Sequence, residues 1–238
     1  MDAPPTQLDE PCEFDSCAAG SPPYGFNVSD PRLNYVNSYP VTSIKYGIDE
    51  LAPKFFQGNK PDLAVAGPNA GNNLCIETQL SGTAGAATYA AKNALIPAIA
   101  FSGAARSQNA WNVTPPQSSI IYGQLATRLT EKLVSSGTPY LPDNSWLNVN
   151  FPIGTGNCTT ADEFSFIFTR IDIAIPFITP LDAEVCGTNR LPTEAEVIIL
   201  DGCYVTVSVG NADTKSDADS DAQGQVYNKL NGFFTCLP

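Results

Sequence analysis

The stretch that decides the fold is Lys60-Pro61-Asp62-Leu63-Ala64-Val65-Ala66-Gly67-Pro68-Asn69-Ala70-Gly71-Asn72-Asn73-Leu74. Its apolar beginning predicts a buried strand, and its glycines and asparagines predict the loop that follows. Ser81-Gly82-Thr83 then opens an alanine-rich helix, and residues 96–103 form a second apolar strand. Strand, loop, helix and strand make a βαβ unit, which binds ligands between its first strand and its helix. We therefore look for function at residues 67–83.

The patterns on either side of this unit predict an α/β fold that becomes rich in strands toward its end. Residues 1–35 are rich in Pro, Ser, Asp and Gly and predict an irregular surface segment, which a Cys12–Cys17 bridge could staple. The other expected elements are helices over 41–56, 118–134 and 225–234, strands over 146–152, 164–175 and 196–209, and an acidic solvated stretch over 211–223.

Composition limits the classes of partner. The 238 residues carry a formal net charge of −12, so the chain as a whole repels a nucleic acid duplex. Hydrophobic residues make up 43% of a chain that is long enough to bury a core, but no apolar run is long enough to span a bilayer. We expect neither a duplex nor a membrane as partner, whereas a small anion can still bind where local dipoles favour it.

The chain contains no histidine. This excludes the Ser-His-Asp and Cys-His arrangements of nucleophilic catalysis and the histidine-based zinc sites. Any catalysis must therefore use carboxylates, hydroxyls, amides, Lys, Tyr or a metal held by oxygen atoms.

The seven cysteines lack the paired spacing of a zinc site and predict disulfides, with one thiol left over. Three glycosylation sequons, which start at Asn27, Asn112 and Asn157, fit the same oxidising compartment, although such tripeptides are common by chance. The first eleven residues have neither the basic region nor the apolar region of a signal peptide. Either the chain is not secreted by the usual route, or the natural start lies further upstream.

Two motifs in the βαβ unit could carry chemistry. Asn69 follows the first strand, and its amide oxygen could ligate a hard cation such as Mg²⁺. A plain Asn/Gly turn explains the same residues about equally well. Ser81-Gly82-Thr83 lies at a helix N-terminus, where free N–H groups and the helix dipole can bind an anion. Simple N-capping by Ser81 or Thr83 is the structural alternative, and one residue can do both.

These residues resemble the SurE family of survival-protein nucleotidases and acid phosphatases. The resemblance rests on residues 61–74, on Leu80-Ser81-Gly82-Thr83 and on Ile96-Pro97-Ala98-Ile99-Ala100-Phe101-Ser102. Weaker matches are Tyr39-Pro40-Val41-Thr42-Ser43, Leu147-Asn148-Val149-Asn150-Phe151-Pro152 and Gly202-Cys203-Tyr204-Val205-Thr206-Val207, so the resemblance spans about 20–210. In style the chain resembles a secreted fungal member.

The resemblance implies a SurE-like, Rossmann-type three-layer fold and a phosphomonoesterase that uses a divalent cation, Mg²⁺ or Mn²⁺, on nucleoside monophosphates and other small phosphate esters. In that family two consecutive Asp, a Ser and an Asn hold the metal, and the Asn corresponds to Asn69. Asn73, Ser81, Gly82 and Thr83 would bind the phosphate. A homodimer is also implied, onto which the C-terminal segment could dock.

The chain departs from the family because it contains no Asp-Asp pair. The first βα unit of the fold, which carries that pair, and the loop with the Ser ligand are missing from these residues. We expect a single domain over 1–238, with an α/β core over 36–140 and a β-rich extension over 141–238, and we expect impaired hydrolysis. The alternative is a non-catalytic protein that binds phosphate or nucleotides.

Overall fold

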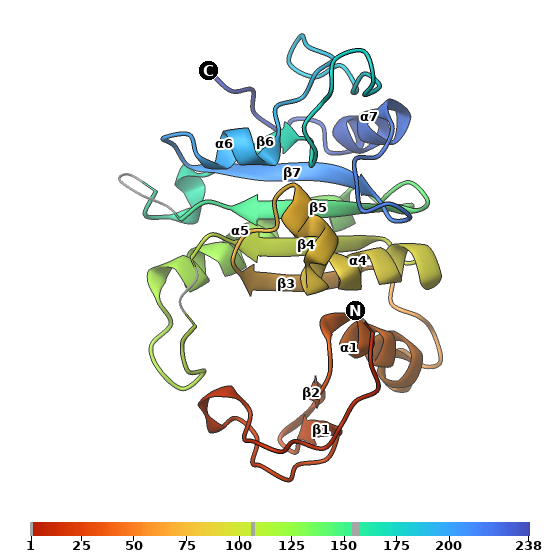
Figure 1. Cartoon of the computed structure of the whole chain (residues 1–238), viewed down its shortest axis with the longest axis vertical. Coiled ribbons are helices and arrows are strands. Elements are labelled where there is room, and N and C mark those ends of the chain that lie inside the picture. The colour runs from red at the N-terminus through yellow and green to blue at the C-terminus, as the bar shows by residue number, and fades with distance from the viewer. Residues whose placement is uncertain (1, 106–107, 154–157) are drawn as a thin grey trace.

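The computed structural model describes residues 2–105, 108–153 and 158–238 and is an α/β fold, as predicted (Figure 1). Its centre is a five-stranded sheet with the order β3-β4-β5-β7-β6. The strands are β3 (Ala64–Ala70), β4 (Ala98–Gly103), β5 (Ser145–Phe151), β6 (Ser165–Thr169) and β7 (Tyr204–Asn211). Neighbouring strands are parallel except β5 and β7, so the strands of the second half continue the same sheet.

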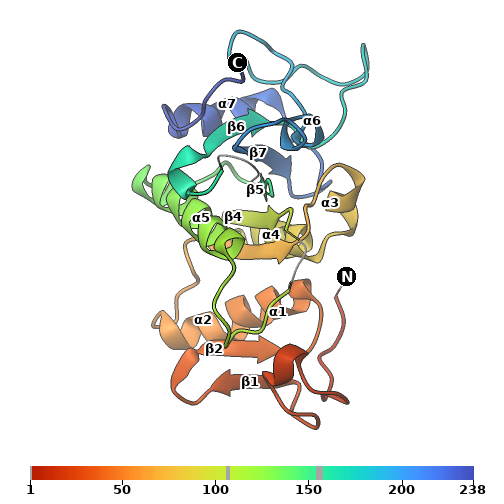
Figure 2. The same cartoon turned by 90° about the vertical axis from the view of Figure 1, so that its left-hand side faces the viewer.

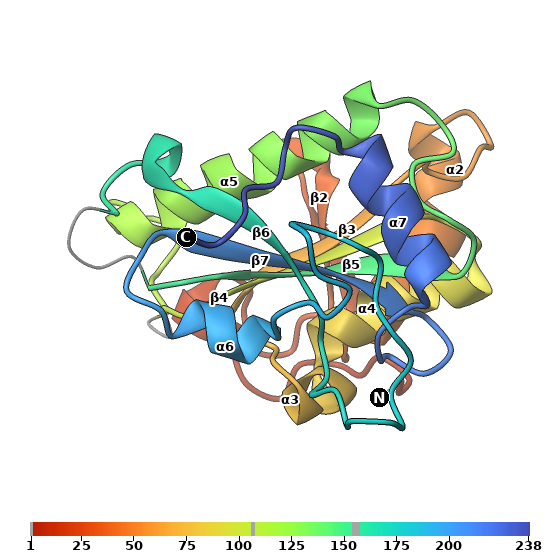
Figure 3. The ribbon, with the colours of Figure 1, turned by 90° about the horizontal axis from the view of Figure 1, so that it is seen from above.

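Helices cover both faces of the sheet (Figure 3). One face carries α3 (Ile76–Leu80), α4 (Gly82–Asn93) and α6 (Glu194–Ile198), and the other carries α5 (Gln117–Ser135) and α7 (Ser220–Lys229). A further helical segment consists of α1 (Pro40–Tyr46), a π-helical turn (Gly47–Leu51) and α2 (Ala52–Phe55), which matches the helix predicted over 41–56.

The sheet is apolar on its α5 side because its strands alternate. Leu147, Val149 and Phe151 of β5 belong to the core cluster that α5 and α7 cover. Helix α5 contributes a stripe at every fourth position, and each of its members is at least 96% buried: Ile121, Leu125, Leu129 and Leu133. Burying one such side chain contributes roughly 1.5–3 kcal/mol, so this face provides most of the hydrophobic stabilisation.

The opposite face packs closely against α4, which has alanines where α5 has leucines. Ala84, Ala87 and Ala90 are fully buried in a second core cluster. Their small side chains let the helix backbone approach β4. Ser81 caps the helix by accepting a hydrogen bond of 3.0 Å from the N–H of Ala84, which confirms the structural reading of this residue.

Strand β3 forms one edge of the sheet, and the layer that contains α1 lies beyond this edge (Figure 2). Val65 in its middle is 47% exposed. Strands of parallel sheets are usually covered on both faces, so β3 is unusually open, and this opens a hollow beside the βαβ loop.

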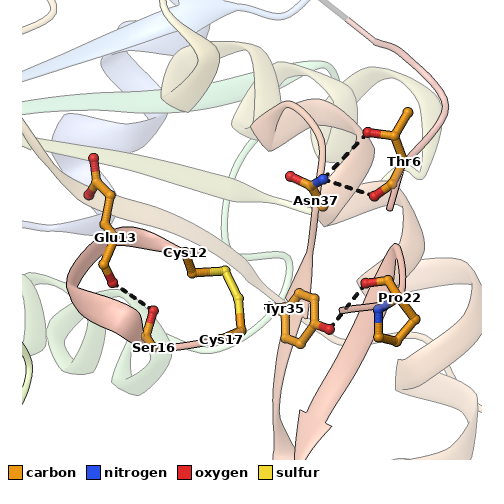
Figure 4. Close-up of a disulfide and its surroundings, with 8 residues drawn as sticks. All are labelled: Thr6, Cys12, Glu13, Ser16, Cys17, Pro22, Tyr35 and Asn37. Carbon is orange, nitrogen blue, oxygen red and sulfur yellow. Dashed lines mark hydrogen bonds between the residues drawn. A yellow bond between two sulfur atoms is a disulfide. The ribbon is translucent and has the colours of Figure 1, made fainter. Parts of the chain in front are cut away.

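The N-terminal segment is more regular than predicted. It contains the antiparallel hairpin of β1 (Tyr24–Asn27) and β2 (Asp30–Val36), which hydrogen bonds fasten to neighbouring segments (Figure 4). The side chain of Asn37 donates to the carbonyl of Thr6 at 2.8 Å, and the hydroxyl of Tyr35 donates to the carbonyl of Pro22 at 3.1 Å. The expectation of an irregular segment over 1–35 is wrong here, because hairpin pairing satisfies the backbone without an apolar pattern.

Two expectations for the second half are also wrong. Residues 194–198 form helix α6 instead of the start of a strand, because Thr193 and Glu196 make a reciprocal capping box. The stretch over 211–223 is not simply solvated, since Ala218 and Gln223 are buried. The predicted strand over 164–175 is shorter and ends at Thr169, and the terminal helix begins five residues earlier than expected, at Ser220.

Three disulfides confirm the prediction from the cysteines. They join Cys12 to Cys17, Cys158 to Cys203 and Cys186 to Cys236, and Cys75 is the remaining thiol. The last two tie the second half of the chain together across 45 and 50 residues. No helix among the described residues is long and apolar enough to cross a bilayer.

Candidate functional site

The loop of the βαβ unit begins where β3 leaves the sheet. Gly67 has a φ of +97°, and a Cβ atom there would collide with the carbonyl of Phe101, so only glycine fits. The pairing of β3 with β4 shifts register between Ala66 and Asn69, which brings Asn69 to the surface. Its Nδ2 donates to the carbonyl of Gly71 at 3.2 Å, and this bond orients the amide while its oxygen remains an acceptor.

Beside this loop lies a hollow of about 490 Å³ between α1, β3 and the start of α4. Asn69 and Thr83 both line it, so the structure brings these two predicted residues together. We call it the Asn69 hollow, and its lining residues are Ser38, Pro40, Ser43, Ile44, Val65, Ala66, Gly67, Asn69, Thr83 and Ala86. Gly82 lets α1 approach, since a Cβ atom there would lie 2.9 Å from Cγ of Pro40. The hollow thus combines an amide, hydroxyls and a helix N-terminus, groups that suit an anion.

Asn73 lies outside the hollow, in the middle of residues 71–75, which we call the Asn73 loop, and it is only 6% exposed. Its side chain donates to the hydroxyl of Ser102, and its backbone N–H donates to Oδ1 of Asn150 at 2.8 Å. Its carbonyl accepts from Nδ2 of Asn148 at 2.9 Å and from Nδ2 of Asn150 at 3.2 Å. These contacts anchor the loop to the sheet, while contact of Asn73 with phosphate stays a prediction.

The anchors of Asn73 belong to a buried polar stripe on the α6 side of the sheet. Register places Asn148 opposite Ser208, and Ser208 opposite Thr169, in one row. The next row joins Ser102, Asn150 and Thr206. All of these side chains are at least 99% buried. Polar side chains in a dry interior are stable only when they form hydrogen bonds with other buried groups.

Glu194, the first residue of α6, joins this network and is fully buried, while Oδ1 of Asn148 has no hydrogen-bond partner among the described residues. Its carboxyl oxygens lie 3.0 and 2.9 Å from Nδ2 of Asn148, and one of them lies 3.3 Å from Nδ2 of Asn150. Burial raises the pKa of this carboxyl well above its ordinary value, although the hydroxyl of Ser208 and the amide of Asn148 oppose the shift. Glu194 therefore keeps its proton at a pH where an exposed glutamate loses it.

The described residues do not fit the divalent metal that the sequence predicted. Carboxylates are absent from the lining of the Asn69 hollow, which offers one amide and a few hydroxyls as oxygen donors. Across residues 2–105, 108–153 and 158–238, no three His, Cys, Asp or Glu side chains gather to hold a cation. Mg²⁺ binds through carboxylates and water, so Asn69 alone is an inadequate ligand.

The survival protein SurE family model matches residues 8–173, which is more than half of the chain. The chain is a member of the SurE family. It is 31% identical to an acid phosphatase from Yarrowia lipolytica, over 94% of this chain and 70% of that protein. A 5'-nucleotidase SurE from Lawsonia intracellularis is 35% identical over 49% of this chain, which spans 40% of its relative.

The fold also agrees with a solved SurE structure. The SurE protein from Aquifex aeolicus superposes with a TM-score of 0.53 at 22% identity, over 88% of this chain and 80% of the other. At this identity the likeness concerns the fold. It confirms the SurE-like α/β architecture predicted from the sequence.

Sequence reasoning missed the network beneath the site. Leu147-Asn148-Val149-Asn150 was interpreted only as an alternating strand and as a family motif. The sequence shows that two asparagines alternate with apolar residues, which also fits a strand with one solvated face. The strand order, with β5 between β4 and β7, is what shows that both faces are covered. Glu194 gave no signal of its own, because its partners lie 44 and 46 residues away in the chain.

Proposed function

We propose that this SurE family member binds the phosphate group of a small monoester, such as a nucleoside monophosphate, in the Asn69 hollow. The observation that carries the proposal is that Asn69 and Thr83 meet there at the N-terminus of α4. The hydroxyl of Thr83 and the N–H groups of the first helical turn would hold the phosphate oxygens. The amide of Asn69 would fix the ester on the other side. The names of the fungal and bacterial relatives support phosphate ester hydrolysis as the reaction class.

Hydrolysis by this chain should be weak, because the described lining lacks carboxylates to hold Mg²⁺ or Mn²⁺. When bound in a complete site, such a cation polarises the phosphoryl group and activates water. Without one, the hollow retains only binding groups. The alternative function, a non-catalytic phosphate- or nucleotide-binding protein, is favoured by the same absence.

The test measures hydrolysis of p-nitrophenyl phosphate with Mg²⁺ or Mn²⁺, together with calorimetric binding of adenosine monophosphate. Asn69→Ala and Thr83→Ala should each weaken binding by about three- to tenfold, which is the loss of one hydrogen bond. Asn59→Ala, an exposed asparagine outside the hollow, is the control and should change nothing. Fast metal-dependent hydrolysis that Asn69→Ala abolishes would contradict the proposed weak activity. Absence of any binding would overturn the binding site.

We also propose that the protein is secreted and glycosylated. The three disulfides support an oxidising compartment, and the sequon at Asn27 lies on the exposed turn of the β1–β2 hairpin. The sequon at Asn112 is also exposed, whereas Asn157 lies outside the described residues. Expression in a fungal host with an added signal peptide, followed by treatment with endoglycosidase, should shift the mass of the protein. No shift would contradict glycosylation.

A further inference from the structure

The buried polar stripe contains a carboxyl, that of Glu194, which forms no ion pair with any described residue. We propose that Glu194 is a positioning residue, which holds the Asn73 loop against the sheet through Asn148 and Asn150. The loop reaches the hollow through its Gly71 carbonyl, which accepts from Nδ2 of Asn69 at 3.2 Å. This inference rests on the proposed function, because the loop matters only if the Asn69 hollow binds a ligand. Among the described residues, Glu194 forms no hydrogen bond with any residue that lines the hollow, so it can act on the site only through the two asparagines.

The physical link has two steps. Glu194 accepts from both amide nitrogens at 2.9–3.3 Å, and this fixes which way each asparagine points. In that orientation the same nitrogens donate to the carbonyl of Asn73, and Oδ1 of Asn150 accepts the N–H of Asn73. Without an acceptor at position 194 the two amides could rotate, and the N–H of Asn73 would lose its partner, while its carbonyl would keep only the hydroxyl of Thr78 at 3.1 Å.

The surroundings of Glu194 favour a neutral carboxyl. In the parts of the chain that the structure describes, no Lys or Arg forms an ion pair with it. The titratable groups that act on it electrostatically are Asp217 and Asp172, which repel its negative form, and the thiol of Cys75 also lies within range. A protonated carboxyl retains one strong acceptor for the asparagines, and its O–H can donate to Ser208, which already bonds Thr169 at 2.8 Å. Acid conditions therefore favour the ordered loop.

Cys75 provides a direct readout of the loop that does not depend on catalysis. It is the thiol outside the three disulfides, it lies at the end of the Asn73 loop, and it is half-buried. Burial raises the pKa of this thiol, so a closed loop reacts slowly with a thiol reagent. The labelling rate of Cys75 under native conditions thus measures how often the loop opens.

The experiment compares Glu194→Ala and Glu194→Gln with the unchanged protein. Removing the acceptor in Glu194→Ala should speed the labelling of Cys75 and the hydrogen exchange of the Asn73 amide by about tenfold, the factor expected for one lost buried hydrogen bond. Glutamine imitates the neutral carboxyl, so Glu194→Gln should stay within about threefold of the parent and should remove the pH dependence of the opening. Gln223→Ala is the matched control, because it truncates an equally buried polar side chain on the other face of the sheet.

Equal labelling and exchange in Glu194→Ala and the parent would overturn the proposal, as would equal acceleration in Gln223→Ala. If Glu194→Ala fails to fold, Glu194→Asp shortens the side chain by one methylene and gives the same comparison. Calorimetric binding of inorganic phosphate completes the test, and we expect weaker binding in Glu194→Ala with rescue in Glu194→Gln. If the parent itself binds no phosphate while the labelling responds as expected, the proposed function fails and the positioning role stands.

Discussion

The molecule buries two polar clusters that are similar in size and opposite in design. In the first, Arg170 bonds Asp182 at 2.7 Å and Asp217 at 2.9 Å, and all three side chains are largely buried. In the second, the carboxyl of Glu194 bonds neutral amides and a hydroxyl, and no described Lys or Arg pairs with it. The first cluster pairs its charges, whereas burial without a cation favours the neutral form of the carboxyl in the second.

The two clusters have different roles. The Arg170 cluster (Arg170, Asp182 and Asp217) stabilises the scaffold, and the Glu194 cluster (Glu194, Asn148 and Asn150) supports the candidate site. Asp217 also accepts hydrogen bonds from the N–H groups of Ile171 and Asp172, so the Arg170 cluster holds the backbone that follows β6 in place. The Glu194 cluster instead ends at the Asn73 loop, whose Gly71 carbonyl accepts from Asn69 of the hollow. A paired charge therefore stabilises the scaffold of this fold, and a carboxyl without a paired cation among the described residues supports the Asn73 loop.

The largest effect on stability should come from disrupting the Arg170 cluster. Arg170→Met leaves buried Asp217 without its cation and Asp182 with only the longer bond to Arg190, so we expect a loss of about 3–5 kcal/mol in the free energy of unfolding, measured with urea. Arg190→Met is the control, because its bond to Asp182 is longer, 3.4 Å, and its side chain is 34% exposed. Equal losses in the two variants would show that burial does not decide the energy of this cluster.

An intermediate effect on stability should come from removing one amide of the Glu194 cluster. Asn148→Leu keeps the volume but removes the donor to Glu194 and to Asn73, so we expect a loss of about 1–3 kcal/mol in the free energy of unfolding. In a double-mutant cycle with Glu194→Ala, which removes the acceptor, the two losses should not add, because both changes act on one network. Simple additivity would contradict the network.

A smaller effect should appear as a pH dependence of stability. The unfolded chain releases the proton of Glu194 at the ordinary glutamate pKa, whereas the folded chain holds it to a higher pH. This contribution to stability is complete below the ordinary value and is lost as pH rises toward the folded pKa. Urea unfolding from acid to neutral pH should show a decline that is flatter in Glu194→Gln. Parallel curves would mean that Glu194 is charged in the folded state.

The smallest effect should come from the surface. Nζ of Lys92 lies 2.9 Å from Oδ1 of Asp213, which is also the distance between the paired atoms of Arg170 and Asp217. The side chains of Lys92 and Asp213, however, are 48% and 54% exposed. Lys92→Ala should leave the melting temperature unchanged within error, because solvent screens exposed pairs. A clear shift would show that distance, and not burial, ranks these interactions.

The sequence predicts those parts of the fold whose signals are local. The leucine stripe of α5 and the cap at Ser81 encode their helices, and the apolar runs on either side encode β3 and β4. The position of Asn69 and Thr83 at one hollow also follows from the βαβ pattern. Helix α6 was missed because the run of isoleucines after Val197 suggested a strand, although Thr193 and Glu196 have capping-box spacing.

The support of the site depends on contacts that no local pattern encodes. The link from Glu194 to Asn148 joins residues 46 positions apart, and the link from Asn150 to Asn73 spans 77. Both depend on the strand order, in which β5 lies between β4 and β7. A sequence reader who lacks the topology has no reason to bring α6 to the Asn73 loop.

The two asparagines of β5 also determine how the sheet can align. A shift of β5 by two residues would keep its apolar face toward α5, and a strand of valines would tolerate such a shift. Here the shift would bring one asparagine to the place of the other and leave its own place to Trp146 or Pro152, so the polar rows would lose one of their two amides and Glu194 one of its donors in a dry interior. The polar rows thus act as an alignment key, which selects one register among the several that hydrophobicity alone permits.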